Sequence, residues 1–294
     1  MTEHLMHEHK RLPSWLRKKV RASEEVLKLK KILKEKGIHT VCQSAGCPNI
    51  SECFSKPTAT FMILGDVCTR HCRFCGIHKG QPGPVDTGEP QHIAETAAAM
   101  NLKHVVITSV TRDDLDDGGA GQFAETITRL HNTLPNATIE ALIPDFSGNR
   151  ESIDKVLSSR LDVLNHNVET VPRLYQEIRP EAEYERSLDL LRYVKAGHPD
   201  ITVKSGVMVG LGETEDELYR VFQDLVSAGC DALTIGQYLA PGLSAFPVQE
   251  YIHPDSFALY KKRALSMGFR RVQSGPYVRS SFHAEDVLIH DEGV

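Results

Sequence analysis

The sequence predicts an α/β fold in which six β/α units form a partial (β/α)6 barrel, TIM-like but open on one side. Six strand-like apolar runs alternate with helical patterns along the chain, and nothing reverses that order. Such alternation is typical of a parallel sheet covered by helices, and right-handed crossovers curl the sheet. A closed barrel of this type has eight units, so six units should leave it open.

Each unit pairs a short apolar, β-branched run with a segment of helical apolar spacing. The strand-like runs are 58–64, 104–110, 138–143, 163–168, 202–209 and 232–239. The helical patterns are 91–100, 121–134, 150–158, 185–196, 214–228 and 254–267. Active sites of such folds lie at the carboxyl ends of the strands, so function is expected in the loops that follow them.

Bulk properties are those of a globular protein, with 294 residues, 40% hydrophobic and 25% charged side chains, and a net charge of −5. The apolar runs are shorter than the roughly 18 residues that suggest a membrane span. The first residues carry no apolar stretch of a secretory signal. Seven cysteines without an export signal favour a reducing, cytoplasmic location, and metal binding rather than disulfides.

A basic segment at 10–36 holds eleven Lys or Arg against three Glu. A nucleic-acid arm would be expected to carry interleaved aromatics or a known binding fold, and neither is present. The apolar residues at 26, 27, 29, 32 and 33 recur at roughly helical spacing, which favours an amphipathic helix with a solvated basic face. Docking to an acidic protein partner is a further hypothesis. We expect no nucleic acid and no membrane as partners.

Three cysteines follow the first strand-like run, at Cys68, Cys72 and Cys75. Thiolates are soft ligands that select zinc, cuprous copper or iron–sulfur clusters. Structural zinc needs four ligands, and this loop offers three. A cubane cluster held by three thiolates keeps one iron free for another ligand, which indicates chemistry rather than bracing. Three incidental buried cysteines are the alternative.

A second triplet, Cys42, Cys47 and Cys53, has the spacing C-x4-C-x5-C and is also one ligand short. Zinc completed by a distant residue is one alternative, and pairing with Cys230 is another. Two incomplete triplets this close together both fit iron–sulfur ligation. The isolated Cys230 is interpreted as an ordinary buried thiol.

The spacing C-x3-C-x2-C, with Phe74 before the last cysteine, resembles the signature of the radical S-adenosylmethionine (SAM) superfamily. The resemblance implies a 4Fe–4S cluster whose free iron binds SAM, and cleavage of SAM to a 5′-deoxyadenosyl radical. It also implies SAM contacts in the loops after the strands. The residues expected there are Thr108, Ser109, Arg112, Asp113, Asn165, Asn167, Glu169, Gly210 and Glu213. Helix capping by the aspartates, and a satisfied polar network at the asparagines, are the alternatives.

Both triplets together with Arg279-Ser280-Ser281-Phe282-His283 resemble the lipoyl synthase family. That resemblance implies a second, auxiliary 4Fe–4S cluster on Cys42, Cys47 and Cys53 with a serine as fourth ligand. Ser281 is the expected serine and Ser280 the near alternative. The implied reaction inserts two sulfur atoms, drawn from the auxiliary cluster, at C6 and C8 of a protein-bound octanoyl-lysine.

The same resemblance implies partners and a division of the chain. The partners are octanoylated lipoyl carrier domains (H protein or E2 subunits of 2-oxoacid dehydrogenases), an electron donor such as flavodoxin or ferredoxin, and an iron–sulfur carrier. The expected parts are an N-terminal extension (1–56), the barrel core (57–245) and a C-terminal extension (246–294), with both extensions covering the barrel mouth. Competing hypotheses are another radical SAM sulfur-inserting or peptide-modifying enzyme, and a zinc-stabilised binding module.

Overall fold

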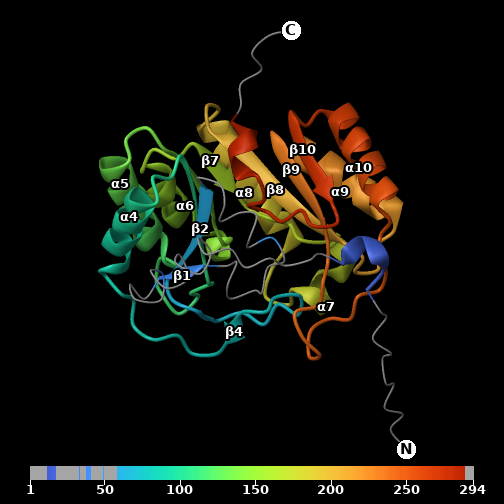
Figure 1. The fold of residues 1–294 in the computed structure, drawn as a ribbon, viewed down its shortest axis with the longest axis horizontal. Coiled ribbons are helices and arrows are strands. Elements are labelled where there is room, and N and C mark those ends of the chain that lie inside the picture. The colour runs from blue at the N-terminus through green and yellow to red at the C-terminus, as the bar shows by residue number, and fades with distance from the viewer. Residues whose placement is uncertain (1–11, 18–32, 34–37, 41–48, 50–57, 289–294) are drawn as a thin grey trace, which may run out of the picture.

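A curved sheet of eight strands organises the molecule (Figure 1). The computed structural model describes residues 12–17, 33, 38–40, 49 and 58–288. Along the sheet the strands are β1 (His39–Thr40), β2 (Thr58–Ile63), β5 (His104–Ser109), β6 (Thr138–Leu142), β7 (Val163–Asn165), β8 (Thr202–Val209), β9 (Ala232–Gln237) and β10 (Arg271–Gly275). All neighbours pair in parallel except β1, which runs antiparallel to β2.

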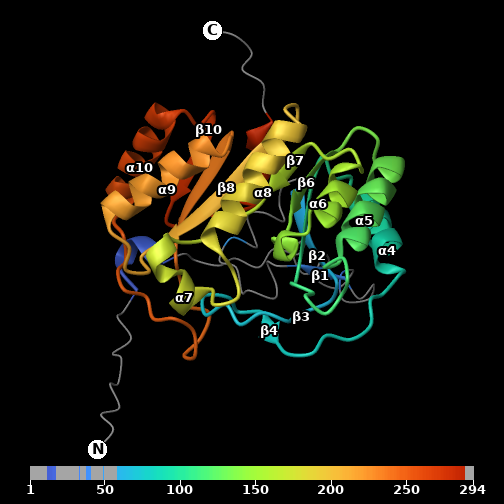
Figure 2. The ribbon, with the colours of Figure 1, turned by 180° about the vertical axis from the view of Figure 1, so that it is seen from behind.

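Helices form an outer layer around this sheet, with α4, α5 and α6 on one flank and α8, α9 and α10 on the other (Figure 2). Their bounds are α4 (Glu89–Ala99), α5 (Ala120–Thr133), α6 (Arg150–Leu157), α8 (Tyr184–Gly197), α9 (Glu215–Ser227) and α10 (Pro254–Met267). Shorter elements are η1 (Ser14–Leu16), η2 (Phe146–Gly148), η3 (Pro172–Leu174), α7 (Tyr175–Ile178) and η4 (Ala284–Val287). None of the helices in the described residues could cross a membrane.

Local sequence explains where these helices begin. At α9 the Thr214 hydroxyl accepts from the Glu217 amide while the Glu217 carboxylate accepts from the Thr214 amide, a reciprocal capping box. At α6 the Asn149 side chain accepts from the amides of Glu151 and Ser152. These caps leave the preceding loops free to turn over the carboxyl ends of the strands.

The predicted fold is confirmed: six β/α units occur in order, each close to its expected bounds. One parallel strand was not predicted, because β10 comes from the segment assigned to the C-terminal extension and pairs with β9. The short strand β1 was also not predicted. Within the described residues β1 and β10 form the two edges of the sheet.

The two faces of the sheet differ in chemistry. Alternate residues such as Phe61, Ile107 and Ile235 are fully buried in one apolar cluster with the helices, and we call this side the outer face. On the inner face, the intervening positions include Glu140 and Lys204, which are also fully buried. A closed barrel of this type fills its interior with branched apolar side chains, so the polar inner face marks a different use of the space.

Candidate active site at the cysteine loop

The triplet Cys68, Cys72 and Cys75 begins at the last residue of β3 (Val67–Cys68) and continues into the loop before β4 (His78–Lys79). These two short strands pair in parallel. This loop leaves the carboxyl end of β2, and Figure 1 shows β4 and α7 at the same end of the molecule. The Cys75 amide donates to the Cys72 carbonyl (3.3 Å), and the Gly80 amide donates to the Cys68 carbonyl (3.0 Å). All three cysteines are free thiols and partly exposed.

Burial raises the pKa of the Cys75 thiol to about 11 and raises the pKa of Cys72 as well. Both thiols therefore hold their protons unless a metal binds, even though the Arg179 guanidinium partly offsets the effect of burial at Cys72. Iron displaces such protons on binding, so the donor set suits a positively charged metal centre that converts thiols to thiolates. The predicted role of the loop fits this chemistry.

Arg70, inside the cysteine motif, fastens the loop to the next two strands. Its guanidinium donates from Nε to Asp113 Oδ2 (2.7 Å) and from Nη2 to Asp145 Oδ1 (2.6 Å). Arg186 pairs with the second oxygen of Asp145 (3.3 Å). Burial alone would raise the pKa of Asp145, but the hydrogen bond from Arg70 holds that pKa well below its usual range. The loop is therefore held by a buried, charge-assisted contact.

The end of β5 and the loop after it contain four of the predicted SAM contacts, Thr108 and Ser109 in the strand and Arg112 and Asp113 in the loop. Arg112 pairs with Asp114 (2.8 Å) and also donates to the Gly83 carbonyl (3.0 Å), so it ties this loop to the segment after the cysteines. The Asp113 carboxylate is occupied by Arg70. Thr108 is buried, and the Ser109 hydroxyl is buried without a hydrogen-bond partner.

The predicted contacts after β7 and β8 are partly engaged within the protein. Asn165 donates both amide hydrogens, to Glu140 (2.8 Å) and to Ser280 (2.9 Å), while its Oδ1 has no partner. Asn167 donates to Glu169 Oε1 (3.1 Å). The backbone of Glu169 is left-handed, with φ +65°, a conformation that is strained for a residue other than glycine. Burial raises the pKa of its carboxyl group, which lies near Cys72 and Cys75 of the cysteine loop.

At the turn after β8 the Glu213 carboxylate accepts from the amides of Gly210 (2.6 Å) and Leu211 (2.9 Å). Gly210 has φ +93°, and a side chain there would collide with Gln237 and Glu250 at 2.3 Å. Both predicted residues therefore shape the turn. Whether they also contact a cofactor stays a prediction.

Arg179, which the sequence analysis missed, supplies a half-buried cation next to Cys72. It donates to the carbonyl of Val168 (3.1 Å) and to the Tyr175 hydroxyl (3.1 Å). Its Nε is buried and has no hydrogen-bond partner among the described residues. Burying an unsatisfied donor is costly, so this atom fits an acceptor from a bound group. Together with the free Asn165 oxygen and the three thiols, it makes the site fit a cluster and a polar cofactor that presents both acceptor and donor groups.

The residues expected for the auxiliary cluster are divided. Cys42, Cys47 and Cys53 lie outside the described residues. Ser280 and Ser281 are described and half-buried. The Ser280 hydroxyl is engaged by Asn165 and Asn167, whereas the Ser281 hydroxyl makes no hydrogen bond within the described part of the chain. Cys230 is a buried free thiol, as predicted.

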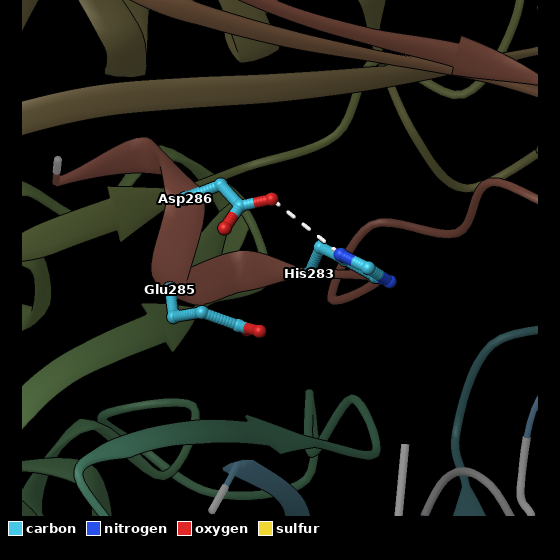
Figure 3. Close-up of side chains that lie close together, drawn as sticks. All are labelled: His283, Glu285 and Asp286. Atoms are coloured by element: carbon cyan, nitrogen blue, oxygen red, sulfur yellow. Dashed lines mark ion pairs between the residues drawn. The ribbon is translucent and has the colours of Figure 1, made fainter. Parts of the chain in front are cut away.

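His283, Glu285 and Asp286 present ligand-type atoms within 4.8 Å of one another (Figure 3). His283 Nδ1 lies 3.5 Å from Asp286 Oδ2, and Glu285 accepts from the Thr58 hydroxyl at the start of β2 (3.2 Å). A cavity of about 190 Å³, lined in part by Lys204 and Asp286, lies at this end. It is the end at which the strands begin, remote from the cysteine loop, so we interpret the cluster as an anchor.

The sequence contains two features that could have indicated three residues not predicted above, Arg70, Glu140 and Lys204. Arg70 stands between two predicted ligand cysteines, where an ordered charge is needed to fix the loop. Glu140 and Lys204 are lone charges in otherwise apolar strand runs, a pattern typical of a buried ion pair.

Comparison with known proteins identifies relatives of high identity. Residues 62–225 match the radical SAM superfamily. The chain is 55% identical to a lipoyl synthase of Caldicellulosiruptor saccharolyticus over 274 residues, covering 93% of this chain and 96% of that one. It is 53% identical to a lipoyl synthase of Caldanaerobacter subterraneus, covering 94% and 96%.

Solved structures share the fold at low identity. Streptococcus suis SuiB bound to its precursor peptide SuiA superposes with a TM-score of 0.60 at 10% identity, covering 85% of this chain and 52% of that one. Methylornithine synthase (PylB) gives a TM-score of 0.53 at 12% identity, covering 86% and 78%. These likenesses support the partial barrel alone.

Proposed function

The chain belongs to the lipoyl synthase family of the radical SAM superfamily, and from this premise we propose its reaction and the residues that perform it. The protein inserts two sulfur atoms at C6 and C8 of an octanoyl chain that is amide-linked to a lysine of a carrier protein. This membership leaves no role for a zinc-stabilised binding module.

Cys68, Cys72 and Cys75 hold the 4Fe–4S cluster that binds SAM. The observation that carries this assignment is the loop itself, with three free thiols at the carboxyl end of β2 beside the unsatisfied Arg179. When bound, SAM and the cluster supply the radical that removes hydrogen from an unactivated methylene, a step beyond any side-chain acid or base.

The protein's own residues position these groups. Arg179 Nε and the free Asn165 oxygen offer one donor and one acceptor to the polar end of SAM, and Glu169 offers an acceptor to hydroxyl groups. Arg70 and Arg112 fix the two loops that frame the site. Such preorganisation lowers the entropy lost when the reacting groups meet. Contacts at Thr108, Ser109, Asp113, Gly210 and Glu213 stay predictions.

Cys42, Cys47, Cys53 and Ser281 hold the auxiliary 4Fe–4S cluster that donates sulfur. Ser281 is favoured over Ser280 because the Ser280 hydroxyl already makes two hydrogen bonds. A hard serine oxygen is a poor match for an iron site otherwise bound by thiolates, so it is suited to release.

The substrate is an octanoylated carrier domain, either an H protein or an E2 subunit of a 2-oxoacid dehydrogenase. Flavodoxin or ferredoxin supplies electrons, and an iron–sulfur carrier renews the consumed cluster. These assignments follow from the family and from the need of the reaction for electrons and sulfur.

The test is anaerobic reconstitution with iron and sulfide analysis. Wild type should hold about eight iron per chain, and a Cys42→Ala, Cys47→Ala, Cys53→Ala variant about four. The variant should still cleave SAM and should form no lipoyl product. Cys230→Ala, which removes a buried thiol outside both triplets, is the matched control and should keep about eight iron. One cluster in wild type and variant alike would overturn the sacrificial-sulfur assignment.

A further inference from the structure

Residues 278–286, which we call the serine segment, cross the inner face of the sheet from the strand ends to the strand starts. Near the ends, a Cβ on Gly236 of β9 would lie 2.2 Å from the Val278 carbonyl oxygen, so only glycine permits this approach. Halfway along β10, Gln273 donates to the His283 carbonyl (2.9 Å), and at the start of β2 the Thr58 hydroxyl donates to Glu285 (3.2 Å). Contacts with β9 and β10 therefore hold the serine segment in place.

Ser280 is the point where the segment meets the polar inner face. Its hydroxyl accepts from Asn165 Nδ2 (2.9 Å) and donates to Asn167 Oδ1 (3.1 Å). Asn165 is 0% exposed and Asn167 is 8% exposed. The half-buried Ser280 hydroxyl, with both donor and acceptor satisfied by these two asparagines, is held in one rotamer.

A buried ion pair on the inner face of the sheet is hydrogen-bonded to Asn165, one of the two partners of Ser280. Asn165 donates its second hydrogen to Glu140 Oε1 (2.8 Å), and Lys204 Nζ lies 3.0 Å from that same oxygen. Both charged side chains are 0% exposed. Such a pair is often no more stabilising than apolar side chains of the same size, so its presence here favours a positioning role over a purely stabilising one.

We propose that Lys204, Glu140, Asn165 and Asn167 are positioning residues that clamp Ser280 and thereby present the neighbouring Ser281 hydroxyl to the auxiliary cluster. This inference rests on the proposed function, in which Ser281 is a ligand. It goes further by giving Ser280 and the ion pair a defined task. The clamp fixes the backbone one residue before the ligand, so the ligand hydroxyl cannot drift away from iron.

The test isolates the auxiliary cluster in a full-length parent variant with Cys68, Cys72 and Cys75 changed to Ala. After reconstitution this parent should hold about four iron. Adding Ser280→Ala should keep the iron but alter the Mössbauer signal of the serine-bound site. Iron removal by a chelator should become about tenfold faster, the factor for losing one or two hydrogen bonds.

Two further variants sharpen the result. Ser280→Thr keeps the hydroxyl and should restore slow chelation. Ser266→Ala removes an α10 hydroxyl that bonds only to the Arg263 carbonyl (2.7 Å), and it should behave as the parent. Asn165→Leu removes one of the two hydrogen bonds to Ser280 and leaves the serine itself unchanged. It should speed chelation in the same direction as Ser280→Ala, and it covers the case in which Ser280→Ala folds poorly.

The outcomes distinguish a failure of the proposed ligand set from a failure of the clamp on Ser280. A parent that holds no cluster, or a Ser281→Ala variant with an unchanged spectrum, overturns the proposed ligand set and this inference with it. A normal parent and an altered Ser281→Ala, combined with unchanged Ser280→Ala and Asn165→Leu, overturn the clamp alone.

Discussion

The outer and inner faces of the same sheet are built on different interactions. The outer face buries Phe61, Ile107 and Ile235 against helices, and apolar contacts of this kind are non-directional and tolerate exchange for similar volumes. The inner face buries Glu140 and Lys204 in a hydrogen-bonded network, in which removal of one partner leaves another buried and unpaired. The first face therefore maintains the fold, whereas the second determines where particular groups stand.

The largest expected effect tests the inner face. Lys204→Met should lower the free energy of unfolding by about 3–5 kcal/mol, because it leaves Glu140 charged and buried without its partner. The double variant Lys204→Met, Glu140→Leu should recover most of that loss. Anaerobic urea denaturation followed by circular dichroism measures both. Additive losses in the double variant would contradict the pairing.

A smaller effect is expected where the polar network reaches the cysteine loop. Arg70→Gln should cost about 1.5–3 kcal/mol, the range for hydrogen bonds to charged groups. The loss leaves Arg186 and the Ser147 amide as partners of the Asp145 carboxylate. The variant should also release iron faster from the SAM-binding cluster, measured by chelation of a Cys42→Ala, Cys47→Ala, Cys53→Ala background. Arg129→Gln, on the exposed surface of α5, is the control and should do neither.

A pH effect separates the helix layer from the inner face. His166 bonds to the Ile143 carbonyl and to Ser187 of α8, and burial lowers its pKa from 6.5 to about 4. The unfolded chain therefore binds a proton at higher pH than the folded one. Stability should be full above pH 6.5 and should fall by about 3 kcal/mol as the pH approaches 4.

Denaturation midpoints between pH 7 and pH 4 check the histidine effect, and His166→Gln should flatten the slope. Glu140 behaves in a lower window. Burial opposes its ionisation, but Lys204 and His104 keep its pKa below the ordinary 4.5. Its contribution is therefore present above pH 4.5 and lost as the pH falls further. A single transition with no slope above pH 4.5 would contradict the assignment to His166.

The smallest effect tests the outer face. Ile107→Val removes one methylene group from the apolar cluster and should cost about 1 kcal/mol. Iron content and SAM cleavage should stay at the wild-type level, since the fold retains its inner geometry. A loss of cluster from this variant would show that the two faces are not independent.

Much of the fold follows from the sequence because strand and helix periods are local. The runs ending at 64, 110 and 209 were found for this reason. The strand β10 was missed because Arg271–Gly275 carries mainly polar residues and a single buried valine, so it lacks the apolar signal of a central strand. The strand gains its place from pairing with β9, which is a tertiary interaction.

The candidate site likewise has one part that local sequence predicts and another that depends on tertiary contacts. Cysteine spacing predicts Cys68, Cys72 and Cys75 as ligands because the three residues lie within one loop. The clamp on Ser280 joins residues more than one hundred positions apart, so no local pattern reveals it. Asn165 illustrates the limit, since a cofactor contact and a satisfied network were equally compatible with its position after a strand.

The path of the serine segment across the inner face has a consequence for biosynthesis. Residues 271–286 leave the ribosome after every other strand, while domains begin to fold during synthesis. Asp286 of this segment lines the same cavity as Lys204, so the segment covers the inner face beside the ion pair. We expect that side of the pair to be more hydrated, and the pair to be weaker, until the segment is in place. A nascent chain that stalls before Arg271 retains the sequence of the helix layer and of the cysteine loop, but it lacks the serines proposed to complete the auxiliary cluster site.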